Sequence, residues 1–166
     1  MNPLLFIPCY NHTDQINNLL INIDKYYKDD ILVIDDGSEH ELPKISLPNV
    51  TIKINDKNMG KGQCIIKASK YMNENNYSHL IVLDSDNQHD PSKIIDFLNV
   101  DECVDLVYGK RSFNKPMPLS RIISNTITSS IISILCNKHI YDSQCGYRRY
   151  SANMFKNEIY KEKGYQ

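Results

Sequence analysis

The chain has 166 residues, of which 41% are hydrophobic and 23% are charged. This composition supports one folded domain with a substantial core and excludes disordered, collagen-like and low-complexity proteins. The net charge of −1 is the sum of two unlike parts, because residues 1–106 carry 9 basic and 17 acidic groups, whereas residues 107–166 carry 10 and 3.

Apolar runs alternate with helical patterns through the first two thirds of the chain. The runs are bounded by proline, glycine or aspartate, as buried strands are, and apolar side chains between them recur at helical spacing. This alternation predicts an α/β fold with a mostly parallel sheet. The predicted strands are residues 4–7, 31–34, 50–54, 79–83 and 106–108. The first predicted helix follows a cap at Thr13 or Asp14 and runs through residue 23, the second opens at the segment 58–62 and runs through residue 72, and the third runs from residue 91 to about residue 99.

The pattern of apolar and polar residues changes after residue 110. Residues 119–135 place apolar side chains on one face of a helix, with mainly Ser, Thr and Asn elsewhere. We interpret this segment as a helix packed on the sheet, with a membrane-surface or partner helix as the alternative. A last helix, capped by Ser151, is expected to reach Gln166. Without an internal repeat or linker, residues 1–166 are expected to form a single domain.

Cysteine spacing and hydropathy exclude further classes of protein. The five cysteines are widely spaced and contain no CxxC pair, so neither a disulfide framework nor a zinc knuckle is indicated. The N-terminus has no basic segment of a signal peptide, and no stretch approaches the roughly 18 apolar residues of a transmembrane helix. We therefore expect a cytoplasmic protein, acting in solution or at the cytoplasmic face of the membrane.

Acidic residues follow two of the predicted strands directly. Asp35 and Asp36 follow one, and Asp84 and Asp86 follow another. Because ligands bind at the carboxyl ends of parallel strands, and clustered carboxylates are costly without a counter-charge, this edge of the sheet suggests a cation site. The alternative is that Asp84 or Asp86 only caps the following helix.

Five motifs occur in a fixed order. They are IPCYN at residues 7–11, DDGS at 35–38, NMGKG at 58–62, DSDNQH at 84–89 and DSQCGYR at 142–148. The series resembles family 2 glycosyltransferases of the GT-A fold, and among them polyprenyl-phosphate sugar transferases such as dolichol-phosphate mannose synthase. The resemblance extends from residue 4 to about residue 165. It implies a mostly parallel, Rossmann-like sheet flanked by helices.

The resemblance implies a nucleotide-sugar site in the first part of the chain. Asp36 would bind the base, in a pocket walled by Pro8, Tyr10 and Asn11. Residues 58–62 do not complete a phosphate-binding loop, but Lys61 is expected to contact the nucleotide sugar. The donor would be a UDP- or GDP-hexose.

The resemblance also implies a metal site. Asp84 and Ser85 would lie in the nucleotide-sugar site, and Asp86 and Gln88 would coordinate Mg²⁺ or Mn²⁺ bridging the donor diphosphate. A divalent ion is needed because the diphosphate leaving group gains negative charge as the glycosidic bond breaks. His89 is expected to be a structural or capping residue rather than a catalytic base.

The four arginines stand out in a chain that otherwise uses lysine, and a planar, bidentate donor suits phosphate. By resemblance, Arg111 would contact the donor, and Arg121 and Arg148 would act in catalysis near the diphosphate and the acceptor phosphate. Each could instead tie a loop to a buried carboxylate. For Arg149 a solvated position is the simpler interpretation. Asp142 is the candidate base, although it could also orient Arg148 or cap a turn.

The expected reaction is direct displacement with inversion, in which a hexose moves from the nucleotide sugar to a polyprenyl phosphate. An ionised phosphate needs no base, whereas a glycan or other hydroxyl acceptor would need Asp142. Two further alternatives are a catalytically impaired nucleotide-sugar-binding module and a metal-dependent nucleotidyltransferase. Nucleic acid is not expected as a partner, because the basic part lacks interleaved aromatic residues.

The unequal charge of the two parts of the chain predicts that they have different roles. Residues 1–106 would form the donor half, and residues 107–166 the acceptor-side half, facing the diphosphate and an anionic lipid head or membrane surface. Domains of the family generally continue past the GYR motif. The chain is therefore expected either to be a fragment or to have its acceptor site completed by a partner or a membrane.

Overall fold

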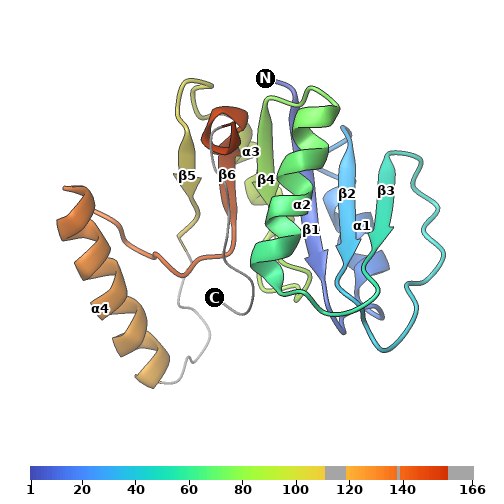
Figure 1. The fold of residues 1–166 in the computed structure, drawn as a ribbon, viewed down its shortest axis with the longest axis horizontal. Coiled ribbons are helices and arrows are strands. Elements are labelled where there is room, and N and C mark those ends of the chain that lie inside the picture. Colours follow the sequence, from blue (N-terminus) through green and yellow to red (C-terminus); the bar gives the residue numbers. More distant parts are fainter. Residues whose placement is uncertain (111–118, 138, 157–166) are drawn as a thin grey trace.

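The computed structural model describes residues 1–110, 119–137 and 139–156, and its centre is one sheet (Figure 1). The described strands have the spatial order β3-β2-β1-β4-β6-β5. Strands β1 to β4 pair in parallel, whereas β6 runs antiparallel to both β4 and β5. The prediction of a mostly parallel α/β sheet is confirmed. The strands are β1 (Pro3–Cys9), β2 (Ile31–Asp35), β3 (Val50–Ile54), β4 (His79–Val82), β5 (Leu106–Tyr108) and β6 (Arg148–Ser151).

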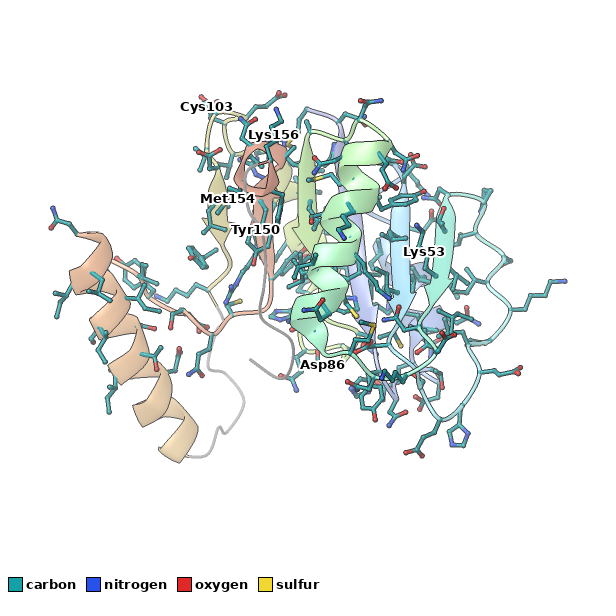
Figure 2. All side chains as sticks on the ribbon, in the orientation of Figure 1. Lys53, Asp86, Cys103, Tyr150, Met154 and Lys156 are labelled. Carbon is teal, nitrogen blue, oxygen red and sulfur yellow. The ribbon has the colours of Figure 1, made fainter. Side chains whose placement is uncertain are left out.

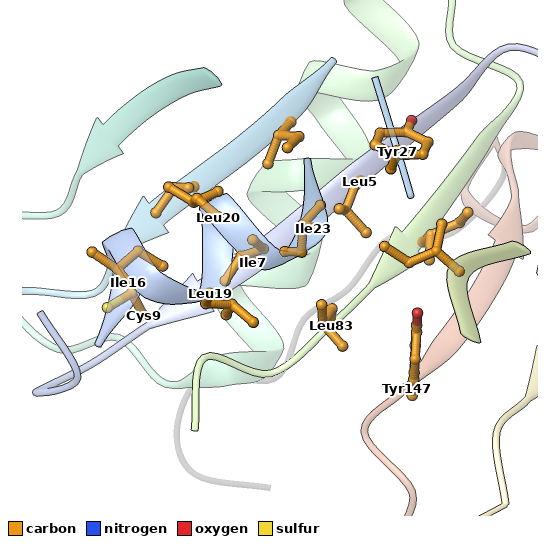
Figure 3. Packing of buried hydrophobic residues seen from close by; sticks show 14 of the residues in the cluster. Leu5, Ile7, Cys9, Ile16, Leu19, Leu20, Ile23, Tyr27, Leu83 and Tyr147 are labelled. Atoms are coloured by element: carbon orange, nitrogen blue, oxygen red, sulfur yellow. The ribbon is translucent and has the colours of Figure 1, made fainter. Parts of the chain in front are cut away.

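Helices cover both faces of this sheet (Figure 1). Helix α2 lies on one face, where it forms an apolar cluster with alternate residues of β1, β2 and β4. Helices α1 and α3 lie on the other face and pack on the intervening residues (Figure 3). Because both faces are covered, the central strands read as continuous apolar runs. The helices are α1 (Ile16–Ile23), α2 (Lys61–Glu74), α3 (Ile94–Leu98) and α4 (Leu119–Cys136), with short 3-10 turns at Pro91–Lys93 and Ala152–Phe155.

Strand β6 was not predicted. Its sequence, RRYS, has no apolar run, and its buried positions are Arg149 and Ser151. Ser151 stands at the N-cap position of the 3-10 turn Ala152–Phe155, as predicted, but its side chain makes no capping hydrogen bond. Its hydroxyl instead donates to Asp105 Oδ1 at 2.5 Å. Residues 157–166 of the predicted last helix lie outside the described residues.

Helix α4 forms as predicted, but its packing is the reverse of the expected one. The buried side chains of its described part include Asn125 and Ser129, whereas four of its described apolar side chains are 53–80% exposed. Figure 1 shows α4 standing away from the sheet. The interpretation of a helix packed on the sheet by its apolar face is therefore wrong. The exposed apolar residues of α4 are Ile127, Ile131, Ile134 and Leu135.

No helix in the part of the chain that the structure describes combines the length and the apolar character needed to span a bilayer.

Two buried tyrosines provide a matched test of the core. Tyr27 donates its hydroxyl to the carbonyl of Pro3 at 2.8 Å, whereas the buried hydroxyl of Tyr147 has no hydrogen-bond partner among the described residues. We expect Tyr27→Phe to lower the free energy of unfolding by about 1–2 kcal/mol, because it removes a buried hydrogen bond. Tyr147→Phe should be neutral or stabilise by up to about 1 kcal/mol, because it removes a desolvated hydroxyl. Urea unfolding of both variants checks this, and equal losses would contradict it.

Candidate active site

The loops after β1 and β2 are joined at the carboxyl end of the sheet. Asp36 N–H donates to the carbonyl of Cys9 at 2.8 Å. Asn11 N–H donates to Ser38 Oγ at 2.9 Å, and Asn11 Oδ1 accepts from Glu39 N–H at 3.0 Å. These bonds hold the loop after Pro8, with an exposed Tyr10, beside the DDGS loop. The structure therefore brings the predicted base-pocket residues together.

The two aspartates of the DDGS loop are buried and bind the chain itself. Asp35 Oδ1 accepts from Ser38 N–H at 3.1 Å and from Ser38 Oγ at 2.5 Å. Asp36 accepts from the Asn55 amide at 2.7 Å and from the backbone N–H groups of Met59 at 3.0 Å and Gly60 at 2.8 Å. Asp36 thus fixes the NMGKG motif against the end of β2. The sequence did not predict this role.

Gly37 allows the DDGS loop to lie close to the backbone of residues 57 and 58. Its φ is +73°, a conformation that glycine adopts without strain. A Cβ there would lie 2.6–2.8 Å from backbone atoms of Lys57 and Asn58. The glycine of the DDGS motif is therefore required for the two loops to meet.

Asp84 follows β4 and lies beside His89 of the same motif and beside two residues that come from distant segments. Its Oδ1 forms an ion pair with Lys61 Nζ, from the first turn of α2, and its Oδ2 lies 3.8 Å from His89 Nε2. Gly146 approaches so closely that a Cβ there would overlap the Asp84 carboxylate. Burial raises the pKa of Asp84, but His89 and Lys61 outweigh this effect and lower the pKa to about 2. The carboxylate is therefore ionised at neutral pH.

The remaining residues of the DSDNQH motif form a turn. Asp86 Oδ1 accepts from Gln88 N–H at 3.0 Å, and Asn87 has a left-handed backbone with φ 56°. Ser85 is buried, whereas Asp86 is half-buried and Gln88 is exposed. Figure 2 shows Asp86 at the end of the sheet where α2 begins.

These side chains suit a hard divalent cation. Asp84 and Asp86 supply carboxylate oxygens and Gln88 an amide oxygen, which are the donors that Mg²⁺ and Mn²⁺ prefer. Asp84 already attracts a cation, the Lys61 ammonium. Among the described residues, no three His, Cys, Asp or Glu side chains form a metal-binding group. The predicted ligands are accordingly limited to two carboxylates and an amide, and the further coordination positions would have to be filled by oxygens of a bound diphosphate.

The second part of the site links α4 to the loop before β6. The buried Asp142 accepts from the Asn125 amide at 2.9 Å, and Ser129 Oγ donates to Ser143 Oγ and accepts from Ser143 N–H, both at 3.0 Å. Ser133 Oγ accepts from Ile140 N–H at 2.9 Å. The sequence analysis missed these helix residues. The available signal was a row of small polar residues at every fourth position, which lie on one face of the helix.

Arg148 holds the same loop in place. Its Nε donates to the carbonyl of Cys145 and its Nη2 to that of Ser143, both at 2.7 Å, and the guanidinium lies 5.3 Å from the centre of the Tyr108 ring. Arg121 belongs to α4, but its side chain, like the whole of Arg111, lies outside the described residues.

Comparisons with solved structures show that the fold is of the GT-A type found in glycosyltransferases. Glucosyl-3-phosphoglycerate synthase from Mycobacterium tuberculosis, solved with Mn²⁺, UDP and glucosyl-3-phosphoglycerate, matches with a TM-score of 0.68 at 15% identity, over 92% of this chain and 57% of that one. TarS from S. aureus matches with a TM-score of 0.62 at 19% identity, over 95% and 49%. The chain therefore spans about half the length of these solved proteins.

The family is defined by sequence. The model for glycosyl transferase family 2 matches residues 5–162, and this chain belongs to that family. A relative from Methanocaldococcus jannaschii, the uncharacterized protein MJ0544, is 34% identical over 92% of this chain and 73% of its own length. A UDP-N-acetylglucosamine–dolichyl-phosphate N-acetylglucosaminyltransferase from Methanococcus voltae is 29% identical over 92% and 70%.

Proposed function

We propose that this chain is the catalytic domain of a metal-dependent, inverting glycosyltransferase that moves a hexose unit from a nucleotide sugar to a polyprenyl phosphate. Residues 1–106 form the donor half, and residues 107–166 form the acceptor-side half. The observation that carries the proposal is the charged group at the end of β4, where an ionised Asp84 meets Lys61 beside the Asp86 turn. The relative from M. voltae, named for a dolichyl-phosphate acceptor, supports a lipid phosphate.

The base of the nucleotide would lie between the loops after β1 and β2. Tyr10, which is exposed, and the neighbouring Pro8 and Asn11 form one wall in this proposal. Asp36 already uses three of the roughly four acceptor positions of a carboxylate to hold the loop. The last position would accept an N–H of the base. Asp36 would then have two roles, ordering the pocket and binding the base.

The diphosphate would lie over the end of β4. Asp84, Asp86 and Gln88 would hold Mg²⁺ or Mn²⁺, with the buried Ser85 fixing the turn and Lys61 near the phosphates. When bound, the ion supplies positive charge to the departing diphosphate. The Mn²⁺ in a solved structure of the same fold supports this choice of metal.

The acceptor would enter on the side of Asp142. A lipid phosphate is ionised at neutral pH and needs no base, which agrees with an Asp142 that is buried and bound to Asn125. Asp142 then positions the loop, Arg148 braces the same loop through two carbonyls, and Arg121 and Arg111 are proposed to contact the phosphates. A glycan acceptor would instead need Asp142 as the base.

The exposed apolar face of α4 supports a membrane-bound acceptor. Four large apolar side chains there are exposed within the described part of the chain, and the segment 107–166 has a net charge of +7, which favours an anionic lipid surface. The described cysteines Cys9, Cys64, Cys103 and Cys145 are free thiols, as in a reducing compartment. We therefore propose contact with the cytoplasmic face of a membrane.

Neutral polar substitutions on α4 test this contact. Ile131→Gln combined with Ile134→Gln should weaken binding to vesicles of phosphatidylcholine with about one third phosphatidylglycerol by roughly tenfold or more, because two apolar side chains leave the interface and no charge is added. Ile21→Gln is the control, since Ile21 on α1 is also exposed. Vesicle flotation measures both. Equal binding by the α4 variant and the control would exclude α4 as the contact.

A thermal-shift screen tests the donor site. Saturation with the correct UDP- or GDP-sugar plus Mn²⁺ should raise Tm by about 5–10 °C at a hundredfold excess over Kd, because a ligand that binds only the folded state stabilises it by mass action. The same sugar with a chelator should give a smaller shift. If no nucleotide sugar shifts the melting of well-folded protein, the proposed donor site is wrong.

A further inference from the structure

The ammonium group of Lys61 occupies the charged centre of the proposed donor site. Its Nζ forms an ion pair with Asp84 Oδ1. Lys61 comes from the first turn of α2, and Asp84 follows β4, so the pair joins segments that are distant in the sequence. The side chain of Lys61 is 44% exposed. It can therefore turn away into solvent without any movement of the backbone.

Both oxygens of Asp84 have close neighbours. Lys61 takes Oδ1, while Oδ2 faces His89 Nε2 at 3.8 Å and the backbone of Gly146. A Cβ on Gly146 would overlap the carboxylate and come within 2.8 Å of Lys61 Nζ. The loop before β6 thus covers the ion pair on one side. A divalent cation that binds Asp84 must therefore take an oxygen that Lys61 now holds, or sit beside the ammonium group.

We propose that Lys61 is the resident counter-cation of Asp84 and that it gives up this carboxylate when the divalent metal binds together with a nucleoside diphosphate. The inference rests on the proposed function. Two cations beside one carboxylate repel each other at short range, so metal alone binds weakly. The diphosphate brings negative charge that can take up the released ammonium group. Metal and nucleotide therefore strengthen each other's binding, and the coupling is reciprocal.

Mn²⁺ titrations with and without UDP test this exchange. Free Mn²⁺ is measured by electron paramagnetic resonance, so the readout does not depend on catalysis. Lys61→Met removes the charge, and we expect its affinity for Mn²⁺ without nucleotide to rise about five- to tenfold. The gain in Mn²⁺ affinity on adding UDP should shrink by a similar factor. Lys61→Gln, a second neutral variant, should behave in the same way.

One control keeps the charge effect separate from the site. Lys70→Met removes one charge from the exposed side of the same helix and should leave Mn²⁺ binding unchanged. Circular dichroism and thermal melting establish that each variant is folded before it is titrated.

The outcomes separate this inference from the proposed function. If the unsubstituted chain binds Mn²⁺ neither alone nor with UDP, the metal-dependent donor site itself is wrong. If it binds Mn²⁺ with UDP, but folded Lys61→Met and Lys61→Gln bind Mn²⁺ alone no more tightly than Lys70→Met, the counter-cation role of Lys61 is wrong and the donor site stands. Tighter Mn²⁺ binding by both neutral variants, with reduced coupling to UDP, supports the exchange.

Discussion

Replacing Asp86 by asparagine should lower the kcat/KM of sugar transfer by about a hundredfold or more, because the proposed metal ion would lose a charged ligand at the departing diphosphate. The asparagine side chain keeps an oxygen that can accept the hydrogen bond from Gln88 N–H, as Asp86 does at 3.0 Å. The turn should therefore keep its shape while the charge is lost. Transfer to a polyprenyl phosphate and Mn²⁺ binding are the two measurements.

Asp96→Asn is the matched control for this loss. Asp96 is exposed and pairs with Lys93 on the surface, so its substitution makes the same change in net charge away from the strand ends. We expect transfer and metal binding close to those of the unsubstituted chain. If Asp86→Asn kept full activity and Mn²⁺ affinity, Asp86 would not be a metal ligand, and the metal site would have to be reassigned.

Replacing Arg149 by methionine should lower the free energy of unfolding by about 3–5 kcal/mol. Arg149 is fully buried, and burial lowers the pKa of its guanidinium. Its Nη atoms donate to four backbone carbonyls, and methionine would leave these buried or partly buried acceptors without their donors. The carbonyls belong to Phe97 at 2.9 Å, Val100 at 2.7 Å, Asp101 at 2.7 Å and Val104 at 3.3 Å.

Urea unfolding with two comparison variants measures this effect. Arg149→Lys keeps a charge but cannot reach all four carbonyls in the same fork geometry, so an intermediate loss is expected. Lys156→Met changes an exposed residue and should alter the free energy of unfolding by less than about 0.5 kcal/mol. A loss below about 1 kcal/mol for Arg149→Met would show that the guanidinium does not hold the segment after α3.

Local sequence patterns predicted most of the first half of the fold. The apolar runs that became β1, β2 and β4 are buried on both faces of the sheet, and the helical spacing of α1 and α2 marks the sides that pack on it. These signals are readable because each depends on neighbours within a few residues. The same reasoning located the acidic strand ends, since every parallel strand presents its carboxyl end at one edge.

Periodicity also predicted α4, but not the direction in which it faces. Burial of an apolar stripe is the usual outcome for a helix, yet here Asn125 and Ser129 turn inward to the loop that carries Asp142. Hydrogen bonds to that loop determine the orientation. A hydrophobic pattern cannot predict hydrogen bonds to residues in another part of the chain.

The sequence by itself determined the order in which the polar motifs follow one another along the chain. They are a loop on the base side, an acidic pair, a glycine-rich turn and a second acidic turn, and a local pattern identifies each of them. Only the tertiary structure decided what these groups touch. Asp36 holds the glycine-rich turn, Arg149 forms the centre of an unpredicted strand, and Lys61, Asp84 and Gly146 meet from three segments. The reason is physical, because such contacts join residues far apart in the chain and depend on geometry that only the packed sheet provides.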